Sequence, residues 1–524
     1  MRYRLKFTLL PGEAWYGANI SDGWKLPITE KSKTKTDTRY ISSYNQASPL
    51  WLSTKGRYLW SDEGYLVKWK KGKASCFSKK AEIRLYDGFE TLRGAYLAAA
   101  KNHFPFDGKI PDEMMFRGPQ YCTWIHLATN QRQTDILKFA KSILAAGMPP
   151  GELIIDDGWQ TTFGHWDFHP DKFTDPRAMI CELHAMGFKV ILWICPFVAP
   201  EAPDYEMMVR EKMLVRDRRG KVASRVWWNG KHPLLDFSNP RSVKWFEDLT
   251  AHLMADYGVD GFKQDAGDAY FYKDSDRTFR PGVDANEQSF LWAETARKYS
   301  FNELRACFKG GGWGVTQRLS DKTHSWDRNG LNTLIPNALL QGLCGYPYSC
   351  PDMIGGGEIS SFKEKTGEVF DRDKREDQFD TELLTRWCQC SALMPMMQYS
   401  FALWNLKDET ARNACLSAAK LHVAYADQII ALAKQASVTG EPIIRSAEYQ
   451  YPHEGYEAVK DLFFLGDSIL VAPVVKKGER QKTVRLPAGN WKYLPTGTVY
   501  PGGQQVTVEA PLSVLPLFEK MQQQ

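Results

Sequence analysis

The stretch GFKQDAGD, residues 261–268, is the strongest indication of the fold that we expect for this chain. It begins as a short apolar strand and carries two acids where that strand ends. The helix that feeds it opens with Asn239-Pro240, a capping residue followed by proline at the first helical position. A helix that leads into a short buried strand is part of a β/α unit, so the stretch predicts a parallel sheet.

The same alternation of short apolar strands and amphipathic helices extends from about Pro119 to Ala433. Eight strands can be placed, which is the number that closes a (β/α)8 TIM barrel. They span residues 120–124, 153–155, 190–193, 261–263, 304–308, 315–319, 345–349 and 394–398. We therefore expect an α/β fold in which residues 113–435 form the catalytic barrel.

Short β-type runs broken by turns flank the predicted barrel on both sides. The runs at 3–9, 50–52, 65–67 and 81–86 predict an N-terminal β-sandwich over residues 1–112. Residues 32–37, rich in lysine and threonine, are expected to be an exposed loop. After a long helix from Asp408 to about Lys434, runs at 442–444, 462–464, 468–475, 483–486 and 506–508 predict a C-terminal β-domain over residues 436–524.

The composition is that of a folded soluble protein, with 43% hydrophobic and 25% charged residues among 524. No segment approaches the roughly eighteen apolar residues of a transmembrane span, so we expect no membrane partner. The N-terminus has too short an apolar run for a signal peptide, which favours a cytoplasmic location unless a signal was removed. The ten cysteines lie far apart, which predicts reduced thiols and no disulfide framework.

Charge argues against a nucleic-acid partner. The net charge is +5, and lysine and arginine are scattered except in two short patches at residues 31–35 and 70–73. Neither patch joins an aromatic platform. Histidines without a metal-binding helix motif, a Gly-rich run without a phosphate-loop lysine and the lack of a Gly-x-Ser-x-Gly elbow disfavour a zinc hydrolase, a nucleotide enzyme and an esterase. We expect no metal or organic cofactor.

Carboxylates follow four of the predicted strands, at the end where a TIM barrel carries its active site. They are Asp156 and Asp157, Asp265 and Asp268, Asp321, and Asp352. Any one of them could be a helix cap or a surface charge, but four coincident cases favour a site. Glycoside hydrolysis needs one carboxylate and one carboxylic acid across the scissile bond. Asp265 and Asp321, two β/α steps apart, fit that need.

Tryptophan is abundant, with 18 residues in the chain. Sugar sites use flat apolar rings against the C–H face of the sugar, although a single tryptophan is more often part of a core. Several lie beside the acids: Trp159, Trp193, Trp227, Trp228, Trp313 and Trp326. The pair Trp227-Trp228 precedes Asn229-Gly230 in a polar segment, which makes it a candidate for substrate contact.

The motifs resemble glycoside hydrolase family 31 over most of the chain. GFKQDAG at 261–267 is similar to the family's nucleophile segment, although Asp268 stands where the family has glutamate, and RLSDKTHSWD at 318–327 is similar to its acid/base segment. The resemblance implies Asp265 as nucleophile and Asp321 as proton donor. Asp327 is then expected on the following helix, as a positioning or capping group and the runner-up for the acid.

Further stretches at 15–17, 226–230, 343–348, 351–356 and 466–474 resemble an α-galactosidase branch of the family. Where the family's α-glucosidases carry Arg-Asn-His after strand eight, this chain has MMQYS at 396–400. The resemblance implies a retaining exo-α-glycosidase that acts on a small terminal α-galactoside. An α-glucoside, α-xyloside, α-N-acetylgalactosaminide or sulfoquinovoside stays open, as do an inactive carbohydrate-binding homologue and a homo-oligomer.

Double displacement would place the carboxyl groups of Asp265 and Asp321 about 5 to 5.5 Å apart. Lys263 and Arg318 would help to keep Asp265 ionised. The residues that we expect to bind the sugar or shape the rim are Asp156, Asp157, Trp193, Trp228, Lys263, Asp268, Arg318, Trp326 and Asp352.

Overall fold

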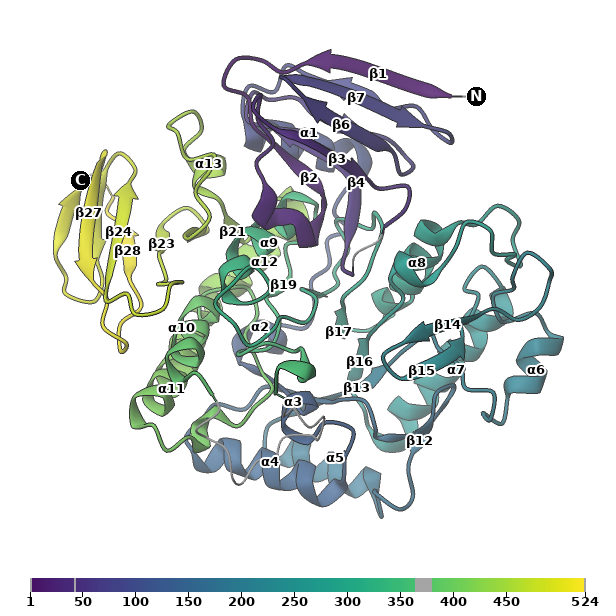
Figure 1. The fold of residues 1–524 in the computed structure, drawn as a ribbon. Coiled ribbons are helices and arrows are strands. Elements are labelled where there is room, and N and C mark those ends of the chain that lie inside the picture. The colour runs from purple at the N-terminus through teal and green to yellow at the C-terminus, as the bar shows by residue number, and fades with distance from the viewer. Residues whose placement is uncertain (1, 42–43, 363–378, 523–524) are drawn as a thin grey trace.

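A barrel of eight parallel strands forms the centre of the computed structural model, which describes residues 2–41, 44–362 and 379–522 (Figure 1). The strands are β9 (Gln120–Cys122), β10 (Glu152–Ile155), β13 (Lys189–Ile194), β16 (Gly261–Gln264), β17 (Phe301–Leu304), β18 (Gln317–Arg318), β19 (Ser349–Cys350) and β20 (Gln398–Tyr399). Their order is β19-β18-β17-β16-β13-β10-β9-β20, and a parallel bridge from Met353 to Gln398 brings the two ends together. The predicted TIM barrel is confirmed.

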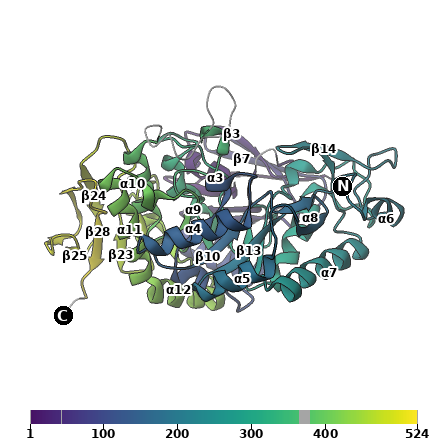
Figure 2. The same cartoon turned by 90° about the horizontal axis from the view of Figure 1, so that it is seen from below.

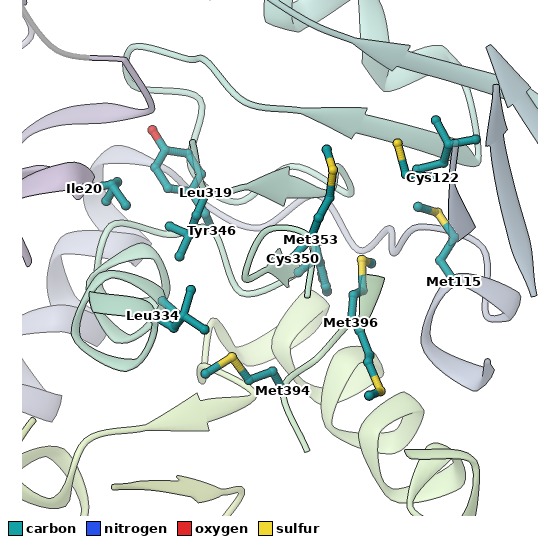
Figure 3. Packing of buried hydrophobic residues seen from close by; sticks show 14 of the residues in the cluster. Ile20, Met115, Cys122, Leu319, Leu334, Tyr346, Cys350, Met353, Met394 and Met396 are labelled. Carbon is teal, nitrogen blue, oxygen red and sulfur yellow. The ribbon is translucent and has the colours of Figure 1, made fainter. Parts of the chain in front are cut away.

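The first four barrel strands and β18 lie where the sequence predicts them, but β17, β19 and β20 are displaced. β17 begins three residues before the predicted span, and β19 and β20 have only two residues each. The apolar residues expected to form those strands instead fill buried loops, where Tyr346, Met394 and Met396 pack in the core (Figure 3). The sequence of a short apolar run is the same whether the run forms a buried strand or a buried loop, which explains the displacement.

Helices surround the barrel, and α4, α5 and α7 lie along its outside (Figure 2). The main ones are α4 (Gln133–Ala145), α5 (Pro176–Ala185), α7 (Pro240–Tyr257), α8 (Ala285–Glu294), α9 (Leu334–Leu343), α10 (Thr381–Ser391), α11 (Glu409–Ala424) and α12 (Ala426–Thr439). The cap expected for α7 is present, because the Asn239 side chain accepts a hydrogen bond from the amide of Arg241. The single helix predicted from Asp408 is two helices, which pack on different neighbours, α10 and α2 (Met114–Arg117).

Two four-stranded sheets precede the barrel. One has the order β1-β7-β6-β3, from β1 (Tyr3–Thr8), β7 (Lys73–Ser78), β6 (Leu66–Lys70) and β3 (Lys33–Asp37). The other has the order β2-β4-β5-β8, from β2 (Trp15–Asn19), β4 (Ala47–Ser53), β5 (Tyr58–Trp60) and β8 (Arg84–Tyr86). Between them, the Trp69 ring lies 5.7 Å from that of Trp15 and 5.2 Å from that of Trp51.

The prediction of a loop at residues 32–37 is wrong, because Lys33–Asp37 is strand β3. It pairs antiparallel with β6 over its whole length. The charged composition suggested a loop, but lysine alternates with Thr34 and Thr36, and β-branched residues favour an extended backbone. Alternation lets the lysines face water while the threonines take the other face of the sheet.

The C-terminal strands form a six-stranded and a two-stranded sheet. The first has the order β21 (Ile444–Arg445), β22 (Phe463–Leu465), β23 (Ile469–Val471), β28 (Leu517–Lys520), β25 (Asn490–Tyr493) and β26 (Val499–Pro501), and the second pairs β24 (Gln481–Leu486) with β27 (Gln504–Glu509). Buried Arg386 of α10 donates to the carbonyl of Ala510 and joins this domain to the barrel. No helix in the described ranges has the length and apolar character to cross a membrane. All ten cysteines are free thiols, nine of them buried.

Candidate active site

Asp265 lies directly after β16, at the carboxyl end of the barrel, and is 8% exposed. Its Oδ2 accepts a 2.9 Å hydrogen bond from the indole of Trp193 in β13. Oδ1 accepts no hydrogen bond from the described residues and lies 3.3 Å from Nε of Arg305. One oxygen is therefore anchored and the other is left without a hydrogen bond.

The charges around Asp265 decide its protonation state. Burial alone would raise its pKa, but the positive charges of Arg305, Arg318 and Lys263 outweigh burial and lower the pKa to about 2. This agrees in direction with the expectation that Lys263 and Arg318 hold it ionised. The tight turn after it requires a glycine, because Gly267 has φ +72° and a Cβ there would lie 2.0 Å from the Trp292 ring.

Arg318, at the end of β18, brings the predicted pair of acids to one guanidinium. Its Nη1 lies 2.6 Å from Oδ1 of Asp321, and its Nη2 lies 3.7 Å from Oδ1 of Asp265. Glu303 of β17 holds the other edge of the group, because its Oε1 accepts a 2.9 Å hydrogen bond from Nε of Arg318. The side chain of Asp321 is 28% exposed, whereas that of Arg318 is 1% exposed, so Asp321 faces the opening of the site.

Asp352 is a second acid beside Asp321. Its Oδ1 lies 3.2 Å from Nη1 of Arg318, and its Oδ2 accepts hydrogen bonds from the amides of Lys322 and Gly357. A Cβ on Gly357 would lie 2.8 Å from Oδ1 of Asp352 and 3.0 Å from Oδ1 of Asp321, so both carboxylates border this glycine. Burial and the charge of Asp321 raise the pKa of Asp352 to about 7.

The paired acids after β10 have separate partners. Asp156 accepts a 2.7 Å hydrogen bond from Nζ of Lys263, and this buried ion pair keeps the pKa of Lys263 above its usual value despite burial. Asp157 accepts hydrogen bonds from Asn229 at 2.7 Å and from Gln160 at 2.8 Å. Burial raises the pKa of Asp157 to about 6. Both carboxylates are thus fixed by protein donors.

Arg305 is a site residue that sequence analysis missed. It follows β17 directly, and its guanidinium lies 5.1 Å from the ring centre of Tyr44 and 4.8 Å from that of Trp228. Tyr44, Trp228 and Tyr270 are 43 to 48% exposed, so they form an aromatic rim around the arginine. The displaced strand explains the omission, since a strand predicted at 304–308 places Arg305 inside the strand rather than at its end.

The N-terminal domain also reaches the barrel mouth, a contact that no local sequence pattern predicts. The side chain of Asn45 donates to the carbonyls of Arg305 and Arg318 and accepts from the amide of Ser320. Its own amide donates to Asp268.

Some predicted site residues have other partners. The second oxygen of Asp268 accepts a 2.9 Å hydrogen bond from Arg305, so both its oxygens are occupied. Trp326 donates to Asp380, which also contacts Lys477 of the C-terminal domain. Asp327, expected on a helix, lies in a turn and accepts from Ser325 and the Asn329 amide.

The tryptophans divide between core and rim. Trp159, Trp193 and Trp227 are 0 to 6% exposed and pack on other rings, as Trp227 does on Phe197 at 4.1 Å. Trp228 is the exposed member of its pair, at 44%. Among the described residues no group of three histidine, cysteine, aspartate or glutamate side chains is placed to hold a metal ion.

Carboxylates at the carboxyl ends of eight parallel strands, beside an aromatic rim, are the arrangement expected of a TIM-barrel glycoside hydrolase. A model described as the glycosyl hydrolases family 31 TIM-barrel domain matches residues 114–421. A second, described as the glycosyl hydrolase family 31 C-terminal domain, matches residues 440–522. The chain belongs to glycoside hydrolase family 31, as its motifs predict.

Similar proteins carry several glycosidase names. The myogenesis-regulating glycosidase of Mus musculus is 32% identical over 75% of this chain, and a sulfoquinovosidase of Agrobacterium fabrum is 29% identical over 77%. The chain spans 54% and 63% of the lengths of these two relatives. A Flavobacterium johnsoniae family 31 dextranase complexed with glucose shares the fold, with a TM-score of 0.85 at 20% identity over 99% of this chain and 66% of its own.

Proposed function

We propose that this protein is a retaining exo-α-glycosidase, with Asp265 as the nucleophile and Asp321 as the general acid/base. One observation carries the proposal: a single buried guanidinium, that of Arg318, contacts an ionised, enclosed carboxylate and a partly exposed one. Retaining hydrolysis needs that division, because one carboxylate attacks the anomeric carbon while the other exchanges protons with the leaving group and with water.

The first step would use the ionised carboxylate of Asp265. It would attack the anomeric carbon while Trp193, Arg305 and Arg318 hold it in place. Asp321, in its protonated form, would donate its proton to the departing glycosidic oxygen. The product of this step is a glycosyl ester on Asp265 and a free aglycone.

The second step would reverse the roles. Asp321, now ionised, takes a proton from water, and the water oxygen attacks the anomeric carbon of the ester. Because both steps invert configuration, the released sugar keeps the α-configuration. The rim of Tyr44, Trp228 and Tyr270 supplies rings against which an aglycone could stack.

We propose an α-galactoside as the substrate, on the basis of the motif resemblance and the paired acids Asp156 and Asp157. The names of related proteins keep α-glucosides, α-xylosides and sulfoquinovosides as alternatives. A panel of aryl α-glycosides, which includes the N-acetylgalactosaminide, tests this, with the galactoside expected to give the largest kcat/KM. NMR of the first-formed anomer tests retention. Sugar binding without turnover on any member would instead indicate an inactive homologue.

The pH profile should report the acid pair. Because the pKa of Asp352 is raised to about 7, the cluster of Asp321, Asp352 and Arg318 holds one proton below that pH and loses it above. A general acid needs a proton in this cluster, so kcat/KM is expected to fall as the pH rises through about 7. Asp265, with a pKa of about 2, stays ionised throughout. Initial rates on an uncharged substrate across the pH range measure this limb.

The substitution Asp352→Asn removes the group that titrates but keeps an oxygen for the amides of Lys322 and Gly357. The basic limb is expected to move away from pH 7 in this variant. A limb that stays where it was would show that another group controls it.

A further inference from the structure

One face of the β1-β7-β6-β3 sheet carries exposed lysines in cross-strand register. Lys33 of β3 lies opposite Lys70 of β6, which lies opposite Lys73 of β7. In the adjacent row, Lys35 lies opposite Lys68, and Lys6 of β1 shares the same neighbour, Ser75. We call these six residues the lysine face: Lys6, Lys33, Lys35, Lys68, Lys70 and Lys73.

The lysine face joins the two basic patches that stand apart in the sequence, at residues 31–35 and 70–73. The lysine face could not be predicted from the sequence, because the pairing of β3 with β6 brings the two patches together. All six lysines are exposed, and in the described part of the chain none has an acidic partner within ion-pair distance. Asp37, at the edge of this face, is paired with Arg39 at 2.7 Å.

The lysine face lowers the stability of the folded protein. It also does not reflect a general excess of positive charge in the chain. Like charges directly opposite each other on neighbouring strands destabilise a sheet, and the face has three such pairs. The whole chain has a net charge of only +5, so the six lysines exceed it and the rest of the chain has no net positive charge. A feature that opposes folding and concentrates the charge on one face suggests a partner with negative charge.

The shape of the face favours a flat partner. Neighbouring strands lie about 4.8 Å apart, so the lysines form a close, level array. The side chains between them are small, such as Ser75 and Thr8. The one ring at the edge of this face, that of Phe77, is only partly exposed and lies against the guanidinium of Arg39, 5.2 Å from its centre, which leaves little ring surface for stacking a base or a sugar. At one end, beside the turn between β6 and β7, Leu10 is 42% exposed. Lysines beside an exposed apolar residue are typical of interfacial binding to anionic lipid.

Although the sequence predicts no membrane partner, we propose that the lysine face docks this protein on a membrane surface that contains anionic lipids. The sheet lies at the outer edge of the molecule, with the barrel on its other side (Figure 1). β3 leads into the segment whose Tyr44 and Asn45 reach the barrel mouth. Docking through this sheet would therefore hold the mouth at a defined position relative to the surface. The attraction is electrostatic, so it falls as salt shortens the Debye length.

Vesicle co-sedimentation tests the proposal. The full chain is expected to bind vesicles of phosphatidylcholine with phosphatidylglycerol at low salt, and to bind pure phosphatidylcholine vesicles much less. The variant K33Q/K35Q/K68Q/K70Q should bind the anionic vesicles more than about tenfold more weakly. Its melting temperature should equal or exceed that of the wild type, because three like-charge pairs are gone. Its activity on a soluble aryl glycoside should be unchanged.

The matched control is K101Q/K138Q/K420Q/K492Q, which has the same net charge and changes exposed lysines outside the face. It should keep wild-type vesicle binding. Equal losses in both variants, or no preference of the wild type for anionic vesicles, would overturn the proposal. So would tighter binding to heparin or duplex DNA than to the vesicles at the same salt, because the face would then serve a soluble polyanion.

Discussion

Asp265→Ala is expected to abolish turnover of an aryl α-galactoside, by at least about ten-thousand-fold, or ~5.5 kcal/mol. The variant loses the ionised carboxylate that would attack the anomeric carbon and that Trp193, Arg305 and Arg318 hold in place. It also leaves Arg305 and Arg318 without their shared counter-charge. Steady-state rates on the activated substrate measure the loss, and circular dichroism checks the fold.

A small external nucleophile separates a lost nucleophile from a damaged site. In the space left by the Asp265 carboxylate, azide can attack the anomeric carbon directly, which displaces the aryl group in a single inverting step. The variant should therefore form the β-glycosyl azide, while the wild type forms the α-sugar. Survival of activity within about tenfold of the wild type, or ~1.4 kcal/mol, would exclude Asp265 as the nucleophile.

The acids of the site could be predicted from sequence because the end of a barrel strand has a recognisable local pattern. A short apolar run followed by a carboxylate marks the positions of Asp265 and Asp321, and the coincidence of four such positions indicates a site. The periodicity rule also gives α7, whose cap residue Asn239 is readable by itself. Both patterns are local, so they can be read without knowledge of the tertiary contacts that the rest of the chain makes.

The groups that act on those acids were not predictable, because they depend on contacts between distant segments. Arg305 was hidden by a three-residue displacement of β17, which moved it from inside a strand to the end of one. Asn45 lies in the N-terminal domain, and only the tertiary fold brings its side chain to the backbone of Arg318. The lysine face is a third case, since strand pairing and not sequence spacing creates it.

A buried polar network around Glu303 fixes the positions of the cations beneath the barrel mouth. Glu303, itself 1% exposed, accepts from Arg318 on one oxygen and from Gln398 of β20 on the other. Gln398 stands in the segment where the family's α-glucosidases carry Arg-Asn-His, so that departure contributes to the floor of the site. A buried charge is tolerated only with such partners, and here each cation also faces a carboxylate of the mouth.

Asp321→Ala is expected to lower activity by an amount that depends on the leaving group. A nitrophenolate departs without help, so the first step on such a substrate should lose little, whereas an alkyl or sugar leaving group needs the proton that Asp321 would supply. The loss of kcat/KM should therefore be about a hundredfold to ten-thousand-fold for a disaccharide and much smaller for the aryl substrate. Parallel measurements of kcat/KM on both substrates give the comparison.

The second step provides an independent sign of the same role, because without a base to activate water the glycosyl ester should accumulate. A burst of released phenol, followed by slow turnover, is expected from Asp321→Ala on an aryl glycoside. The matched control is Asp327→Ala, the nearby acid that accepts from Ser325 and the Asn329 amide in a turn, which should keep the wild-type ratio of the two substrates. Equal losses on both substrates for Asp321→Ala, or a leaving-group dependence that appears for Asp327→Ala instead, would assign the proton transfer to another residue.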